Sequence, residues 1–313
     1  MAIATFGKIS AEEQVTTRLV ARQRSRGRLR QWPLLLLLLP SLLLIGLFSY
    51  YPALRSLEGS FTAWDGFSPP TFVGWQNFVD YTHQPLFWTE TRNLGTLVVG
   101  GALISVLFPF AAAELVRGLP TARLHSIVKF LLVVPMVIPQ IVLINIWAYL
   151  LSPSNGLVDT ALGAVGLPQV QWYSDSHTAL LSILLIGFPW VSSLGFLVYM
   201  AGLEAISLEV EDAARLDGAT GFARILHIDA PLTIPQTRFV VVIAGVSIVQ
   251  NFIPILLLTN GGPGNATMVP GLDMYQSAFQ QSEFGYGMAI GTLLFIGMLV
   301  ATSIVLRLLR SRT

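Results

Sequence analysis

The sequence predicts an all-α, polytopic membrane protein, and three observations carry that prediction. Of its 313 residues, 53% are hydrophobic and only 11% are charged, whereas a soluble domain carries about 25% charged residues. Six apolar segments are each long enough to cross a bilayer, which takes about 20 helical residues. Lys and Arg are concentrated in alternate connecting segments, as in membrane proteins. A soluble protein with an unusually apolar core would not show repeated apolar runs of this length.

The apolar segments give the order of the elements. They lie at residues 32–53, 94–116, 130–151, 179–202, 239–259 and 286–308. The first follows a basic tail, residues 1–31, but its apolar run is too long for a signal peptide and no small-residue cleavage site follows it. We therefore expect an uncleaved first membrane helix at 32–53 and an outer loop at 54–93. A core domain of five membrane helices at 94–308 follows, with a polar loop at 203–236, and the chain ends in a short segment at 309–313.

The basic residues set the expected orientation. Of the 18 Lys and Arg, all but Arg55 and Arg92 lie in the tail, in connecting segments on the same side, or in the last residues. Because basic segments stay in the cytoplasm, both termini and the loop at 203–236 are expected there. The predicted location is the bacterial cytoplasmic (inner) membrane. A basic tail before a first membrane helix favours contact with anionic lipid headgroups over nucleic-acid binding.

Ionisable side chains are absent from the middle of the apolar segments. Glu114 comes closest, near the inner end of the second segment. Proton relays, ion-coupled transporters and voltage sensors use intramembrane charges, and an intramembrane hydrolase needs a general acid or base, so these classes are disfavoured. The chain has no Cys and four scattered His, so no metal site is expected.

The sequence also lacks an ATP-binding P-loop. Such a loop requires a Gly-Lys pair followed by Ser or Thr. The two lysines of the chain, Lys8 and Lys129, do not follow Gly. If the protein carries out active transport, the energy must come from a partner.

Neutral polar and aromatic side chains remain inside the segments. They suit an uncharged, hydroxyl-rich solute such as a sugar, although Ser, Asn and Gln also hold membrane helices together. The candidates for a substrate path are Asn145, Trp147, Tyr149, Trp190, Ser193, Tyr199, Gln250 and Asn251. Four of the six segments are expected to be kinked by a proline: these prolines are Pro109, Pro135, Pro139, Pro189 and Pro254. Kinked helices favour a bundle around a gated path.

The loop at 203–236 is unusually polar for this chain, because it holds six of the 17 acidic residues. We predict a helix that begins after Ser207 and ends at Asp217-Gly218, with the glycine in the left-handed conformation. A second helix, capped by Thr220, is predicted to stop before Pro231. Small and acidic side chains in the loop would let a basic partner surface approach closely.

This loop resembles the EAA loop of binding-protein-dependent ABC importers, in which Glu-Ala-Ala, Asp-Gly-Ala and a later Leu-Pro recur. The residues that carry the resemblance are Glu211, Asp212, Ala213, Ala214, Asp217, Gly218, Ala219 and Pro231. The resemblance implies a coupling helix docked in a cleft of an ATPase subunit. Asp212 stands where the family has Glu, with Glu211 beside it, so either acid could pair with a basic residue of the ATPase. Ala230 replaces the usual Leu before Pro231, and the spacing is kept.

Three further segments resemble the permeases of sugar importers. They are Phe72-Val73-Gly74-Trp75-Gln76-Asn77-Phe78, then Thr259-Asn260-Gly261-Gly262-Pro263 followed by Ala266-Thr267, and Phe284-Gly285-Tyr286-Gly287. They place the chain near the larger maltose-permease subunit and the glycerol-phosphate permeases. The resemblance implies the six-helix transmembrane domain of a type I ABC importer that moves a sugar or oligosaccharide by alternating access.

The resemblance also implies the partners. A second homologous permease and two ATPase subunits would complete the transporter, and an extracytoplasmic solute-binding protein would deliver the sugar. This chain would bind no cofactor and would not be an enzyme, because ATP and Mg would be used by the ATPase subunits. An ABC permease for glycerol-3-phosphate or another small polar solute remains an alternative. A membrane-embedded enzyme would need a catalytic group that the sequence does not show, and a passive channel would not need a docking loop.

Overall fold

The computed structural model describes residues 32–153 and 155–309. The basic tail predicted to contact lipid, residues 1–31, lies outside the described part, and so do Arg310 and Arg312. The chain divides into two units, Met1–Glu58 and Gly59–Thr313. The first is helical throughout its described part, with α2 (Trp32–Ile45), the π-helical turn η1 (Gly46–Tyr50) and α3 (Tyr51–Gly59). Helix therefore continues beyond residue 53, the end expected from the apolar run.

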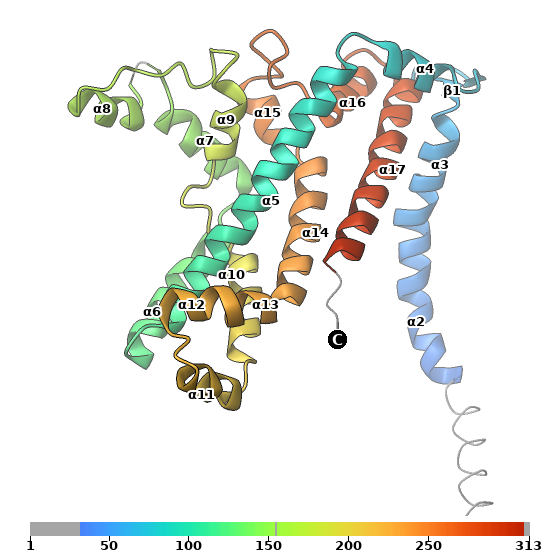
Figure 1. Cartoon of the computed structure of the whole chain (residues 1–313). Helices are drawn as coiled ribbons and strands as arrows, with labels where there is room; N and C mark the ends of the chain where they lie inside the picture. Colours follow the sequence, from blue (N-terminus) through green and yellow to red (C-terminus); the bar gives the residue numbers. More distant parts are fainter. Residues whose placement is uncertain (1–31, 154, 310–313) are drawn as a thin grey trace, which may run out of the picture. The chain divides into compact units, whose positions relative to one another are not determined.

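The second unit is a helical bundle with one short hairpin (Figure 1). Its elements are β1 (Thr62–Ala63), β2 (Thr71–Phe72), α4 (Gln76–His83), α5 (Phe87–Arg117), α6 (Ala122–Val133), η2 (Val134–Val137), α7 (Gln140–Leu150), α8 (Leu157–Ala164), α9 (Ala179–Leu185), α10 (Ser193–Glu204), α11 (Leu208–Leu216), α12 (Gly221–Arg224), η3 (Ile225–Asp229), α13 (Ala230–Leu232), α14 (Ile234–Gln250), α15 (Ile253–Leu258), α16 (Pro270–Phe279) and α17 (Phe284–Leu308). The β strands pair antiparallel, with Thr62 opposite Phe72. We call the end with β1, β2, α4 and α16 the hairpin end, and the end with α11, α12 and α13 the loop end.

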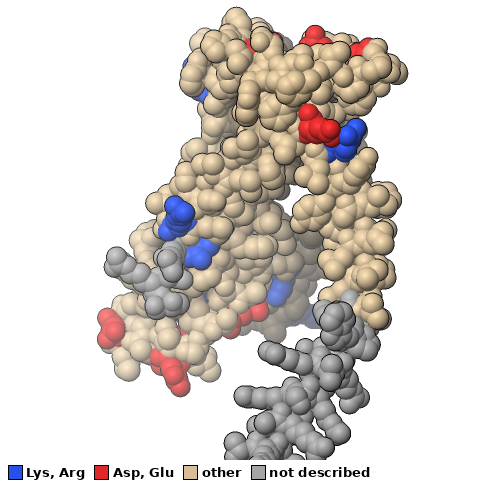
Figure 2. All heavy atoms as spheres, turned by 90° about the vertical axis from the view of Figure 1, so that its right-hand side faces the viewer, with Lys and Arg blue, Asp and Glu red and all other residues tan. Residues whose placement is uncertain are grey.

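The lengths of the helices fit a membrane protein. Within the described residues, the helical stretches Leu36–Gly59, Phe87–Arg117 and Phe284–Leu308 are each long and apolar enough to cross a bilayer. Three bent helix pairs bring the possible number of spans to six. In Figure 2, acidic side chains of the second unit lie toward its two ends, and most of the surface between them is uncharged. The predicted all-α polytopic fold is confirmed.

The prolines break the helices more completely than a kink would. The helix that ends at Val137 and the one that begins at Gln140 meet at 97°, on either side of Pro139. Pro189 lies in the non-helical stretch between α9 and α10. Pro109, in contrast, lies inside α5, which continues without interruption. A proline removes one hydrogen bond from a helix, and neighbouring packing decides whether the helix continues.

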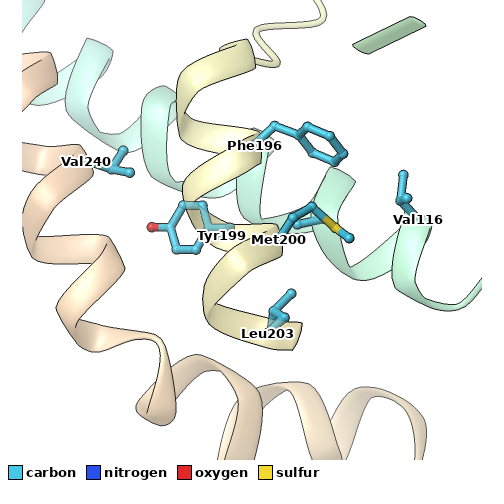
Figure 3. Close-up of a cluster of buried hydrophobic side chains, with 7 residues drawn as sticks. Val116, Phe196, Tyr199, Met200, Leu203 and Val240 are labelled. Atoms are coloured by element: carbon cyan, nitrogen blue, oxygen red, sulfur yellow. The ribbon is translucent and has the colours of Figure 1, made fainter. Parts of the chain in front are cut away.

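The core of the bundle surrounds α10. Phe196, Tyr199, Met200 and Leu203 are all at most 1% exposed, and they face α5 and α14 (Figure 3). Burial of an apolar side chain of this size contributes about 1.5–3 kcal/mol in water, although lipid reduces the driving force for the parts that span the membrane. These contacts fix α10, and with it the start of the loop that follows.

Candidate functional site

The loop between α10 and α14 folds as two helical pieces joined by a glycine turn. The first piece, α11, ends at Leu216, and Gly218 takes a φ of +74°. The Ala219 N–H donates to the Ala214 carbonyl at 2.9 Å and the Gly218 N–H to the Arg215 carbonyl at 3.1 Å. These two bonds form a Schellman motif, the usual glycine ending of a helix. The predicted helix end and left-handed glycine are confirmed.

Two details of the predicted loop differ. Ser207 and Thr220 occupy the N-cap positions of α11 and α12, but neither side chain makes a capping hydrogen bond. The second helical piece does not stop before Pro231, because it continues through η3 and α13 to Leu232. The π-helical turn η3 shifts the bonding by one residue, so that the Ala230 N–H donates to the Ile225 carbonyl. Pro231 then falls at the start of α13, where the missing N–H is tolerated.

A ring of four alternating charges joins this loop to the end of α5. Arg117 donates to Asp229 at 3.1 Å and also contacts Glu211. Arg224 lies 3.3 Å from the same Glu211 oxygen and 3.2 Å from the second oxygen of Asp229. Asp229 is 1% exposed, so its carboxylate depends on the two guanidinium groups. Loss of one partner of a buried ion pair costs about 3–5 kcal/mol.

The ring separates the two acids that the sequence left equivalent. Glu211 is drawn into contacts inside the chain, whereas the Asp212 side chain is 72% exposed and its nearest cation, Arg215, lies 3.8 Å away. Sequence reasoning used Arg117 and Arg224 only to assign topology. The signal that could have singled out Arg117 is its place as the last residue of a long apolar helix.

The outer surface of the loop is both apolar and acidic. Leu208, Leu216 and Phe222 are 75%, 89% and 73% exposed. Ala213, Asp217 and Gly218 are exposed beside them, whereas Ala214 is buried and Ala219 is partly buried. Exposed large apolar side chains grouped with charges are typical of a protein contact surface. The loop can therefore dock against a partner while its inner face contacts α5.

The eight candidate residues for a substrate path fall into two groups. Tyr199 and Ser193 are buried, and their hydroxyls donate to Thr237 at 3.0 Å and to the Leu132 carbonyl at 2.8 Å. Both therefore contribute to packing between helices in this conformation. The others are exposed or partly exposed: Asn145, Trp147, Tyr149, Trp190, Gln250 and Asn251. The Asn145 side chain donates to the carbonyl of Ile141, and the Trp190 indole to that of Leu184.

The three motifs of the predicted outer side meet at the hairpin end. Asn77, from the first, donates to the carbonyls of Ser60 and Thr62, both at 2.9 Å. Gly285, from the third, packs against Thr62 so closely that a Cβ would collide with the carbonyl oxygen.

The second motif is tied to α5 in the same region. Asn93 donates to the carbonyl of Met268 at 2.9 Å, just beyond Ala266-Thr267. Side chains of Leu97, Ile255 and Leu272 pack together beside it. Segments far apart in the sequence therefore form one surface.

An acidic cavity of about 580 Å³ opens on this surface. Asp65, Asp80 and Glu283 line it together with Trp64 and Tyr286. The backbone N–H groups of Phe67 and Ser68 donate to Asp65 and hold the pKa of its carboxyl below the ordinary value. The cavity is therefore negatively charged. Among residues 32–153 and 155–309, no three His, Asp or Glu side chains are placed to hold a metal ion.

A known family accounts for most of the chain. The profile of the family described as "Binding-protein-dependent transport system inner membrane component" matches residues 105–313. The chain belongs to this family. It is therefore a permease component, and the predicted transport subunit without enzymatic activity is confirmed. Its transport system works with a binding protein, and its place is the inner membrane.

Individual relatives agree with this assignment. A probable ABC transporter permease of Pyrococcus horikoshii is 31% identical over 273 residues, which cover 85% of this chain and 92% of the relative. The sulfoquinovosyl glycerol transport system permease of Agrobacterium fabrum is 28% identical, with coverage of 88% and 90%. The trehalose/maltose transport system permease of Thermococcus litoralis is 26% identical, with coverage of 96% and 99%.

The fold itself is known from a bacterial ABC transporter involved in the import of the acidic polysaccharide alginate. The match has a TM-score of 0.78 and 22% sequence identity. It covers 91% of the present chain and 97% of the solved chain. The predicted transmembrane domain of an ABC importer is confirmed as the fold.

Proposed function

We propose that this permease carries a sugar or oligosaccharide across the cytoplasmic membrane by alternating access. The observation that carries the proposal is the exposed surface of α11 and the glycine turn, a docking surface on a membrane bundle that has no P-loop of its own. Relatives named for sulfoquinovosyl glycerol, diacetylchitobiose and trehalose/maltose support the sugar class. The neutral candidates Asn145, Tyr149 and Gln250 are exposed in this conformation, as groups that meet a solute must be.

The proposed assembly has four kinds of subunit. A second homologous permease completes the path, and two ATPase subunits, which use ATP and Mg, dock against α11 and its counterpart on the cytoplasmic side. Both termini lie on that side. In this arrangement Asp212 is the acid that meets a basic residue of the ATPase, because the guanidinium groups of Arg117 and Arg224 already pair with Glu211. The solute-binding protein docks at the hairpin end, whose acidic cavity suits basic side chains.

Reconstitution of the complete transporter tests the proposal. The gene is expressed with its chromosomal neighbours, the complex is placed in lipid vesicles, and ATP hydrolysis is measured with the binding protein and a panel of solutes. The panel contains neutral mono- and oligosaccharides and glycerol-3-phosphate, because one relative is named for sn-glycerol-3-phosphate transport. We expect one sugar class to stimulate hydrolysis. Stimulation by glycerol-3-phosphate alone would replace the sugar with that solute, and the absence of any co-purifying ATPase would refute the docking role.

A further inference from the structure

The ring of Arg117, Glu211, Arg224 and Asp229 has a geometry that suggests more than local stability. Each of the four charges contacts both charges of opposite sign, so the ring is closed. Its members come from α5, α11, α12 and η3. Arg117 is the one member outside the loop, and its guanidinium reaches a carboxylate on each of the two helical pieces.

Other contacts hold α11 only weakly. Ala214 is the buried residue of this helix, and it is small. The exposed residues of α11 point away from the bundle, where they are free for a partner. The ring is therefore the strongest polar connection between α11 and the bundle in the described chain.

Arg117 also ends a helix that connects the two ends of the bundle. α5 contacts α10 and α14, and it contacts α16 of the hairpin end. An arginine suits this position because its planar guanidinium can bond two carboxylates at once, whereas a lysine is a point charge on a flexible stem. A displacement of α11 therefore pulls directly on the end of α5.

We infer that the ring is the joint through which movement of α11 reaches α5, and that Arg117 is the positioning residue of this joint. The inference rests on the proposed function, in which ATPase subunits move α11. It separates two roles within the loop. The exposed face of α11 binds the ATPase, and the ring passes the movement on.

The removal of Arg117 should therefore leave docking intact and impair transmission. Without it, Arg224 faces Glu211 and Asp229 alone. Glu114, one turn earlier on α5, adds a carboxylate whose Oε1 is buried without a hydrogen-bond partner. The two carboxylates of the loop would then have no cation at the end of α5 to bind.

The test compares Arg117→Met, Arg117→Lys and Asp229→Asn with the wild type in the reconstituted transporter. Arg123→Met is the matched control, because Arg123 is an exposed arginine on the neighbouring helix α6. Four quantities are measured: the amount of ATPase subunit that co-purifies, the melting temperature, the solute transported per ATP hydrolysed, and the binding-protein concentration for half-maximal stimulation.

We expect Arg117→Met and Asp229→Asn to retain the ATPase subunits. The solute transported per ATP hydrolysed should fall at least about fivefold, which is the lower end of the usual range for coupling between two sites. The half-maximal concentration of binding protein should not move, and Arg117→Lys should recover part of the loss. Arg123→Met should behave as the wild type.

Three results would overturn the inference: normal transport per ATP in Arg117→Met, loss of the ATPase subunits from that variant, or an equal defect in Arg123→Met. Each of these leaves the proposed function standing if the wild type responds to a solute. A wild-type complex that responds to none would refute the proposed function and the inference with it.

Discussion

Gly218→Val tests the backbone conformation of the docking loop. Gly218 has a φ of +74°, and a Cβ built on it would meet no atom within 4 Å. A side chain at this position therefore causes no collision, and the whole effect comes from the backbone. The left-handed conformation costs an L-residue about 1–2 kcal/mol, and β-branched residues tolerate it least.

This conformational cost lowers the fraction of molecules in which the native turn is formed. A change of about 1–2 kcal/mol shifts an equilibrium by a factor of about 5–30. Since the turn sets the direction in which α11 leaves the loop, the affinity for the ATPase subunit should fall by a similar factor. Asn takes the left-handed conformation more readily than other non-glycine residues, so Gly218→Asn should stay close to the wild type, with Gly218→Ala between Asn and Val.

The assay is a titration of the purified permease complex with its ATPase subunit, read as stimulated ATP hydrolysis. Membrane insertion, measured by yield of the folded permease, should be equal in all variants. An equal affinity for Gly218→Val and the wild type would refute the role of the turn. If Gly218→Asn were as defective as Gly218→Val, the cause would be close approach of the partner and not the backbone conformation.

Three further substitutions test other parts of the structure. Asp212→Asn should weaken co-purification of the ATPase subunits without lowering the melting temperature of the permease, because this carboxylate is exposed; unchanged co-purification would place the contact elsewhere. Gly285→Ala should lower the melting temperature, since its Cβ would collide with the backbone of Thr62 and such overpacking costs about 1–3 kcal/mol; an unchanged melting temperature would contradict the close packing at the hairpin end. Tyr199→Phe removes the 3.0 Å hydrogen bond to Thr237 of α14, which should lower the stability of the permease by about 0.5–1.5 kcal/mol. The solute preference should stay unchanged; an altered preference would place the Tyr199 hydroxyl in the substrate path.

Local sequence signals were sufficient where the physics is local. A long apolar run must form a helix in lipid, because no water is there to bond its backbone, and this fixed the class of fold. Gly218 predicted the end of a helix, and the acidic residues around it predicted a polar loop. Pro231 misled the prediction, because the effect of a proline depends on whether the preceding turn can rearrange, as η3 does.

The roles of single polar residues could not be separated in the same way. Tyr199 and Tyr149 look alike in sequence, yet the first is buried in the core and the second is 62% exposed. Asn77 and Asn93 stood in or near outer segments without an evident task, and they prove to bond backbone carbonyls. Such assignments depend on which helix faces which, and this is set by packing between distant segments.

The sequence by itself thus determined the membrane class of this permease and the position of its polar loop, because hydrophobicity, charge and turn chemistry act over a few neighbouring residues. Its motifs carried the resemblance to the family. Only the tertiary structure decided which acid is available to a partner. Glu211 and Asp212 are adjacent and chemically alike, but successive residues of a helix point in different directions. That rotation turns Glu211 toward Arg117, which is 94 residues earlier in the chain, and leaves Asp212 exposed.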